Sequence, residues 1–156
     1  MRGRGLMGLI GLFLVCGAGA SPAADQDLRW SRYRNARFGV SVEYPAHLFA
    51  EPIEAANGDG IRFEPEGGLS LRIWGRYNVL DQRPYQALCM TPCTGETNRL
   101  DGATAGISSG RRDGAMIYYK KCILRDDEFH CFAIEYPEPL RQVLDGVAAR
   151  MSRTLQ

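Results

Sequence analysis

The residues best suited to chemistry in this 156-residue sequence are its cysteines. Four of them lie in the body of the chain, at Cys89, Cys93, Cys122 and Cys131. Thiol–disulfide oxidoreductases place two residues between their cysteines, so that the attacking sulfur lies near a helix N-terminus. Because three residues separate Cys89 from Cys93, a structural disulfide is the favoured interpretation of this pair, and thiol–disulfide exchange is the alternative.

The other two cysteines flank an expected hairpin. Cys122 and Cys131 lie at equal distances from the midpoint of residues 125–128, where the chain is expected to turn. Directly opposed positions of antiparallel strands bring Cβ atoms close to the separation that a disulfide needs. This symmetry predicts a bridge between Cys122 and Cys131, which leaves Cys89 to bond Cys93. Cross-pairing between the two pairs is the alternative, since four cysteines permit three pairings.

The remaining reactive residues form no catalytic or metal-binding pattern. A zinc site needs four ligands, and His130 with Cys131 supplies two only if the hairpin bridge is absent. Asp126, Asp127 and Glu128 are typical of an exposed turn. Ser108 lies at the centre of a Gly-x-Ser-x-Gly sequence at 106–110, but this segment is expected to be a strand and not the strand-to-helix turn of a nucleophile elbow. We therefore expect no catalytic residue, metal or cofactor, and we expect that the protein is not an enzyme.

Aromatic and arginine residues are the candidates for binding a partner. Tryptophan, tyrosine and arginine concentrate at the hot spots of protein interfaces. Packing in the core is the alternative role for the two tryptophans. The six residues predicted to bind a partner are Trp30, Tyr33, Arg76, Tyr77, Arg83 and Tyr85.

Residues 1–24 have the pattern of a secretory signal peptide. Arg2 and Arg4 precede an apolar run at 6–15, and small residues follow at 18–24. A membrane span needs roughly 20 apolar residues, more than this run contains. We expect residues 1–24 to be removed together with Cys16, leaving a periplasmic or secreted protein without a membrane span. The four remaining cysteines then suit an exported, disulfide-bonded domain.

The length and the charge balance of the chain are typical of a single globular domain. The chain has 19 basic and 18 acidic side chains, a balance that does not indicate a nucleic-acid partner. Residues 25–156 match the commonest size of a single domain and are too few for two.

Hydrophobic periodicity predicts both strands and helices. Alternation over 37–45 places Phe38 and Val40 on one face of a strand, and runs at 61–63 and 69–74 are expected to form a hairpin. A short helix is expected over 84–90 after Pro84, turns over 91–101, and a strand over 104–111. Residues 115–124 and 129–136 form the clearest predicted hairpin, with Lys120 and Glu135 on its cysteine-bearing, more polar face.

The C-terminal segment predicts an amphipathic helix. Its apolar residues recur at spacings of three and four, so one stripe is expected to be buried on the sheet. The residues of that stripe are Leu140, Val143, Leu144, Val147, Met151 and Leu155. The order of elements predicts an α+β fold with a mainly antiparallel sheet of about six strands, a short helix and a long C-terminal helix.

Several segments together resemble a known family. The segments YRNARFGVSVEYPAHLF, GDGIRFEPEGGLSLRIWG and IYYKK with FAIEYP, followed by the terminal helix, resemble exported proteins with the fold of PsbP and DcrB. The resemblance implies an α/β/α sandwich around an antiparallel sheet, serving as a non-enzymatic binding or assembly module.

The sequence therefore predicts an exported, non-enzymatic protein-binding domain of the cell envelope. An immunity or inhibitor protein against a toxin is a narrower hypothesis, because such a protein needs a signal, a rigid disulfide-bonded frame and no active site. Two alternatives are a periplasmic thiol–disulfide protein using Cys89 and Cys93, and a module that binds a lipid or another small molecule.

Overall fold

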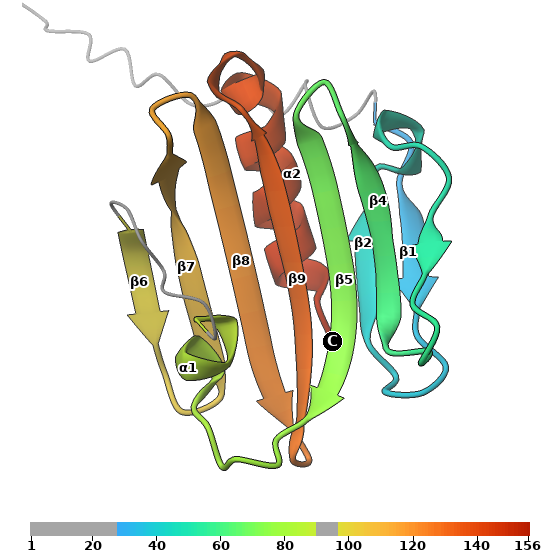
Figure 1. The fold of residues 1–156 in the computed structure, drawn as a ribbon, viewed down its shortest axis with the longest axis vertical. Coiled ribbons are helices and arrows are strands. Elements are labelled where there is room, and N and C mark those ends of the chain that lie inside the picture. The colour runs from blue at the N-terminus through green and yellow to red at the C-terminus, as the bar shows by residue number, and fades with distance from the viewer. Residues whose placement is uncertain (1–27, 90–96) are drawn as a thin grey trace, which may run out of the picture.

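A computed structural model of the chain describes residues 28–89 and 97–156 and confirms the α+β fold. In these residues a seven-stranded antiparallel sheet has the order β3-β4-β5-β9-β8-β7-β6 (Figure 1). A separate pair of strands, β1 and β2, lies beside it. The strand bounds are β1 Ser31–Arg34, β2 Ser41–Tyr44, β3 Ile53–Glu54, β4 Gly60–Glu66, β5 Leu69–Tyr77, β6 Thr97–Asp101, β7 Ala105–Arg112, β8 Met116–Arg125 and β9 Glu128–Pro137.

Two helices lie on opposite faces of the sheet. The long helix α2 (Arg141–Thr154) follows a 3-10 turn at Glu138–Leu140 and lies behind the sheet in Figure 1, whereas the short helix α1 (Pro84–Leu88) lies in front. A second 3-10 turn covers Ala46–Leu48. No helix within the described ranges is both long and apolar enough to cross a membrane.

The two predicted hairpins are confirmed. Strands β8 and β9 pair with Arg125 opposite Glu128, and the two residues between them, Asp126 and Asp127, have φ angles of 47° and 63°. Positive φ at both central positions is the geometry of a type I′ turn, whose twist matches that of the strands. Strands β4 and β5 are also joined by two residues with positive φ, Gly67 and Gly68.

The main core lies between the sheet and α2. Strand alternation directs the apolar side chains of β4, β5, β8 and β9 to this face, and α2 buries Leu144, Val147 and Met151 against them. The predicted stripe is wrong for two residues: Leu140 is 42% and Val143 43% exposed. Leu140 precedes α2, and Val143 lies about 100° around the helix from Leu144, at the edge of the buried stripe.

Three strands were not expected from the sequence: β1, the two-residue β3 and β6. The prediction of turns over 91–101 is wrong for 97–101, which form β6, and the polar segment 31–34 forms β1. In the described part of the chain, each of these strands has one strand neighbour only. Strand β2 is further held to the end of α2, because the backbone groups of Ser41 and Gln156 donate hydrogen bonds to each other at 2.9 and 2.8 Å.

Candidate functional site

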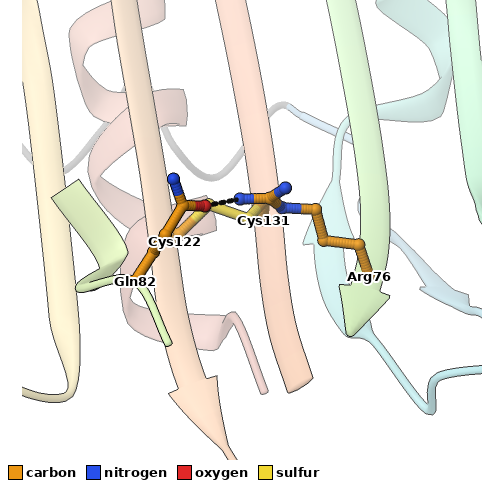
Figure 2. Close-up of a disulfide and its surroundings, with 4 residues drawn as sticks. All are labelled: Arg76, Gln82, Cys122 and Cys131. Atoms are coloured by element: carbon orange, nitrogen blue, oxygen red, sulfur yellow. Dashed lines mark hydrogen bonds between the residues drawn. A yellow bond between two sulfur atoms is a disulfide. The ribbon is translucent and has the colours of Figure 1, made fainter. Parts of the chain in front are cut away.

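The hairpin disulfide lies on the sheet face opposite α2. Cys122 and Cys131 are bonded, with Cα atoms 4.1 Å apart, as the sequence symmetry predicts. Figure 2 shows the bridge between β8 and β9, and Arg76 of β5 donating a hydrogen bond to Gln82 on the same face. This pairing excludes a bond from Cys89 to either residue.

The chemistry of this bridge is structural. Both cysteines are fully buried, packed with Phe129 of β9 and with Ala87 and Leu88 of α1, so an attacking thiolate has no path to the sulfur atoms. Cys89 is also disulfide-bonded, and Cys93, its predicted partner, lies outside the described residues.

Helix α1 covers only part of this face. It begins at Pro84, with the Gln86 side chain accepting a hydrogen bond from the Arg83 backbone N–H, and it packs on β7 and β8. A glycine makes this close approach possible: a Cβ atom on Gly106 would lie 2.3 Å from the backbone nitrogen of Tyr85. Beyond α1, the face over β4, β5 and β9 forms a groove of about 570 Å³.

Side chains from four strands line this open-face groove. In one row across the sheet, Arg62 pairs with Arg72, and Ala133 lies between Arg72 and Lys120. Trp74 lies in the next row, two residues along β5 from Arg72. The guanidinium of Arg72 lies over the Trp74 ring, 4.9 Å from its centroid. Such stacking orients an arginine while leaving its donors available.

The charges of the groove are unevenly compensated. Glu64 pairs with Arg62 at 3.2 Å, and Glu135 pairs with Arg112 at 2.9 Å. By contrast, Arg72 and Lys120 form no ion pair with any residue that the structure describes. Burial lowers the pKa of the Lys120 amine, and the nearby Glu135 carboxylate opposes that shift. The groove, which is also lined by Asp59, therefore presents the Arg72 guanidinium without an ion-pair partner among the described residues and next to an aromatic ring.

Three of the six predicted partner-binding residues lie on the other side of the sheet. Trp30 packs against the main core, with the Arg150 guanidinium 4.1 Å from its ring centroid. Tyr33 also packs on this core, and Tyr77 is 51% exposed with its ring edge-on to Phe38. Core packing, the alternative role for both tryptophans, is what the structure shows: Trp30 packs on the main core, and Trp74 packs on the second buried cluster around the disulfide.

The other three lie on the α1 side. Arg83 pairs with Asp101 at 3.2 Å and joins α1 to β6, while the Tyr85 ring lies under the Arg99 guanidinium. Only Arg76 lines the groove, where its guanidinium lies 5.1 Å from the ring centroid of Phe129. The six residues thus do not form one surface.

The groove residues absent from the predicted set are Arg62, Arg72, Trp74 and Lys120. The hairpin register had placed Lys120 and Glu135 on the polar face. The pairing of the hairpin does not reveal how far α1 extends over that face. The extent of α1 decides whether the face is covered.

A second groove, of about 880 Å³, lies beside α2 above β7 and β8. The charged groups at its rim are already paired: Arg111 with Glu138 at 2.7 Å, and Arg141 with Asp145 at 3.1 Å. The Tyr136 hydroxyl also donates to Asp145, at 2.7 Å. This groove therefore offers less uncompensated charge to a ligand than the open-face groove.

No cluster of three or more histidine, cysteine, aspartate or glutamate side chains suited to holding a metal occurs among residues 28–89 and 97–156. Comparison of the sequence with protein-family models and with curated proteins finds no match.

Proposed function

We propose that the chain is a non-enzymatic binding domain and that it recognises another protein through the open-face groove. The observation that carries this proposal is the stack of the exposed Arg72 side chain on the half-buried Trp74 ring, on a part of the sheet face that α1 leaves open. Tryptophan and arginine dominate the binding energy of protein interfaces. A stacked arginine is held in place before binding, so less side-chain entropy is lost when the partner arrives.

Charge indicates the kind of partner. Arg72 and Lys120 have no ion-pair partner in the described part of the chain, whereas the neighbouring Glu64 and Glu135 are paired. An acidic segment of a partner complements such a surface and is steered to it by the electrostatic field. A lipid would instead need an enclosed apolar cavity, whereas this groove is open and is lined by charged as well as apolar side chains, which favours the protein partner over that alternative.

Disulfides support an exported role. The bonded pair Cys122–Cys131 and the bonded Cys89 suit an oxidising compartment, in agreement with the signal pattern of residues 1–24. We propose that the protein acts in the periplasm or outside the cell. Its resemblance to the PsbP and DcrB family supports a role in binding rather than catalysis. Inhibition of a toxin is the narrower role within this class, and a toxin gene beside its own would support that role.

The test is retention of a partner by charge-reversed variants. The purified chain is immobilised and exposed to an envelope extract, and retained proteins are identified by mass spectrometry. The variant Arg72→Glu/Lys120→Glu should lose the retained protein. The control Arg34→Glu/Arg153→Glu makes the same change of charge at exposed positions outside the groove and should keep it.

A titration with the purified partner then measures the effect. We expect the groove variant to bind at least about tenfold more weakly than the wild-type chain, a loss of about 1.4 kcal/mol. Equal affinity of the wild-type, groove and control chains would overturn the proposal, as would retention of no protein above empty beads.

A further inference from the structure

Strand β6 leaves one edge of the sheet open. In the described part of the chain it pairs with β7 alone and is the last strand of the sheet (Figure 1). The Gly102 N–H donates to the Ala105 carbonyl at 2.9 Å, so Gly102 points its backbone groups toward β7. Alternation along the strand then turns the backbone groups of Leu100 toward β7 and those of Arg99 and Asp101 away from the sheet. Such outward groups are a template for pairing with another strand.

The side chains along this edge alternate between the two faces. On the α1 side, an Arg99 guanidinium nitrogen lies 2.6 Å from a carboxylate oxygen of Asp101, which also pairs with Arg83 of α1. Leu100 lies on the other face and is 47% exposed, because α2 lies behind the centre of the sheet and does not cover β6 (Figure 1). The edge therefore combines outward backbone groups, two opposite charges and an exposed apolar side chain.

These three features match a second copy of the same strand. If two β6 strands run antiparallel with their Leu100 residues opposed, Arg99 of each copy lies opposite Asp101 of the other. The outward backbone groups of these two residues then bond across the interface, and opposite charges directly across a strand pair stabilise it. The Asp101 carbonyl already accepts a hydrogen bond from Arg83, and its second lone pair is left for this bond.

Other registers of the same pair are worse. A two-fold axis at Arg99 would oppose two arginines, and an axis at Asp101 would oppose two carboxylates, which is destabilising. An axis at Leu100 satisfies the charges and places the two exposed leucines against each other on the far face. Because one strand supplies both halves of this match, the occupant that it indicates is a second copy of the chain.

We propose that two copies of the chain associate through β6, with a two-fold axis at Leu100, and join their sheets into one. The axis is perpendicular to the joined sheet, so both open-face grooves lie on the same side of the dimer. They stay uncovered, because the groove lies over β4, β5 and β9, away from β6. The dimer therefore goes beyond the proposed function and does not rest on it.

The first test uses two single variants that are complementary to each other. Arg99→Asp gives the edge two acids, and Asp101→Arg gives it two arginines, so each variant alone opposes like charges twice across the axis. Each should dimerise at least about tenfold more weakly than the wild-type chain in sedimentation equilibrium. An equimolar mixture opposes an acid to an arginine at both positions and should recover the dimer. Mixing cannot repair a defect that lies within either chain, so the recovery is specific to the interface.

The second test fixes the register with a cysteine on the axis. Leu100→Cys places two thiols at directly opposed antiparallel positions, as in the bonded pair Cys122 and Cys131 with its Cα atoms 4.1 Å apart. We expect a disulfide-linked dimer on a non-reducing gel. The control is Ala103→Cys, which is also exposed. Its two copies would lie about six residues apart along the strands, roughly 20 Å, and should not become linked.

Three results would overturn the dimer through β6. The first is a wild-type chain that sediments as a monomer at about 1 mM, the weak end of measurable association. The second is wild-type dimerisation by both charge variants in a folded state, as judged by circular dichroism. The third is linkage of Ala103→Cys as complete as that of Leu100→Cys, and this test decides alone if the charge variants do not fold. No other protein is present in these experiments, so a monomer would leave the role proposed for the groove unaffected.

Discussion

Removal of the Cys122–Cys131 bridge should destabilise the fold by an amount that the structure lets us divide into two parts. The bonded residues are 9 positions apart, so the bridge closes a loop of about ten residues. In the chain-entropy model such a loop restricts the unfolded chain by about 2.7 kcal/mol at 25 °C. This part depends on the link alone.

The second part comes from packing. Both cysteines are fully buried against α1, so replacing them with alanine also removes two sulfur atoms from a close-packed cluster. Each loss costs roughly 1 kcal/mol. The Cys122→Ala/Cys131→Ala variant should therefore lose about 4 to 5 kcal/mol, a large share of the 5–15 kcal/mol that stabilises a typical domain.

A second variant separates the two parts. Cys122→Ala/Cys131→Val restores most of the buried volume without the link, so its loss should approach the cross-link part alone. With a denaturant slope of about 1.5 kcal/mol per molar urea, its unfolding midpoint should fall by about 1.8 M. Tryptophan fluorescence in a urea series measures this. Chemical reduction is not an equivalent perturbation, because Cys89 is also disulfide-bonded. An unchanged midpoint in the valine variant would refute the entropic reasoning.

Two further predictions concern helix packing and alkaline stability. Gly106→Ala should destabilise the fold by about 1–3 kcal/mol in urea unfolding, because its Cβ would lie 2.3 Å from the Tyr85 nitrogen. The control Gly146→Ala places its Cβ in open space on α2 and should instead stabilise the fold by about 0.5–1 kcal/mol. Burial and the hydrogen bond to Asp145 raise the pKa of the Tyr136 hydroxyl above its unfolded value of about 10. The contribution of this hydroxyl to the free energy of unfolding is therefore complete below pH 10 and is lost as the pH rises beyond that value. Tyr136→Phe should therefore show a shallower fall of the urea midpoint between pH 9 and 11, and an unchanged slope would contradict this assignment.

The cysteine-bearing hairpin was predictable because several local signals agree. The symmetry of Cys122 and Cys131 and the acidic turn both specify one register, and a slip by one residue would turn every apolar side chain to the wrong face. The α2 stripe was predictable for the same reason, apart from Leu140 and Val143, which lie at its start and edge.

The groove depends on features without a local signal. If residues of β4 and β5 are paired one by one outward from the Gly67-Gly68 turn, Arg62 falls opposite Ile73, whose side chain lies on the core side of β5. An irregularity between Phe63 and Glu66 shifts the register by one residue, and this shift aligns Arg62 with Arg72 on the open face. Because neither this bulge nor the extent of α1 follows from hydrophobic periodicity, the sequence indicated a polar face but not an open one.

The central position of β9 determines when the molecule can assemble during synthesis. Strands β5 and β8 are not neighbours, and each joins the sheet only through β9. A nascent chain that ends before Glu128 therefore has two separate strand sets, β3–β5 and β6–β8, with no strand to join them. Only when residues 128–137 emerge can one sheet form, and α2 follows at once to cover it. The sheet is thus completed by the last elements of the chain, so its central pairings depend on contacts between segments far apart in sequence.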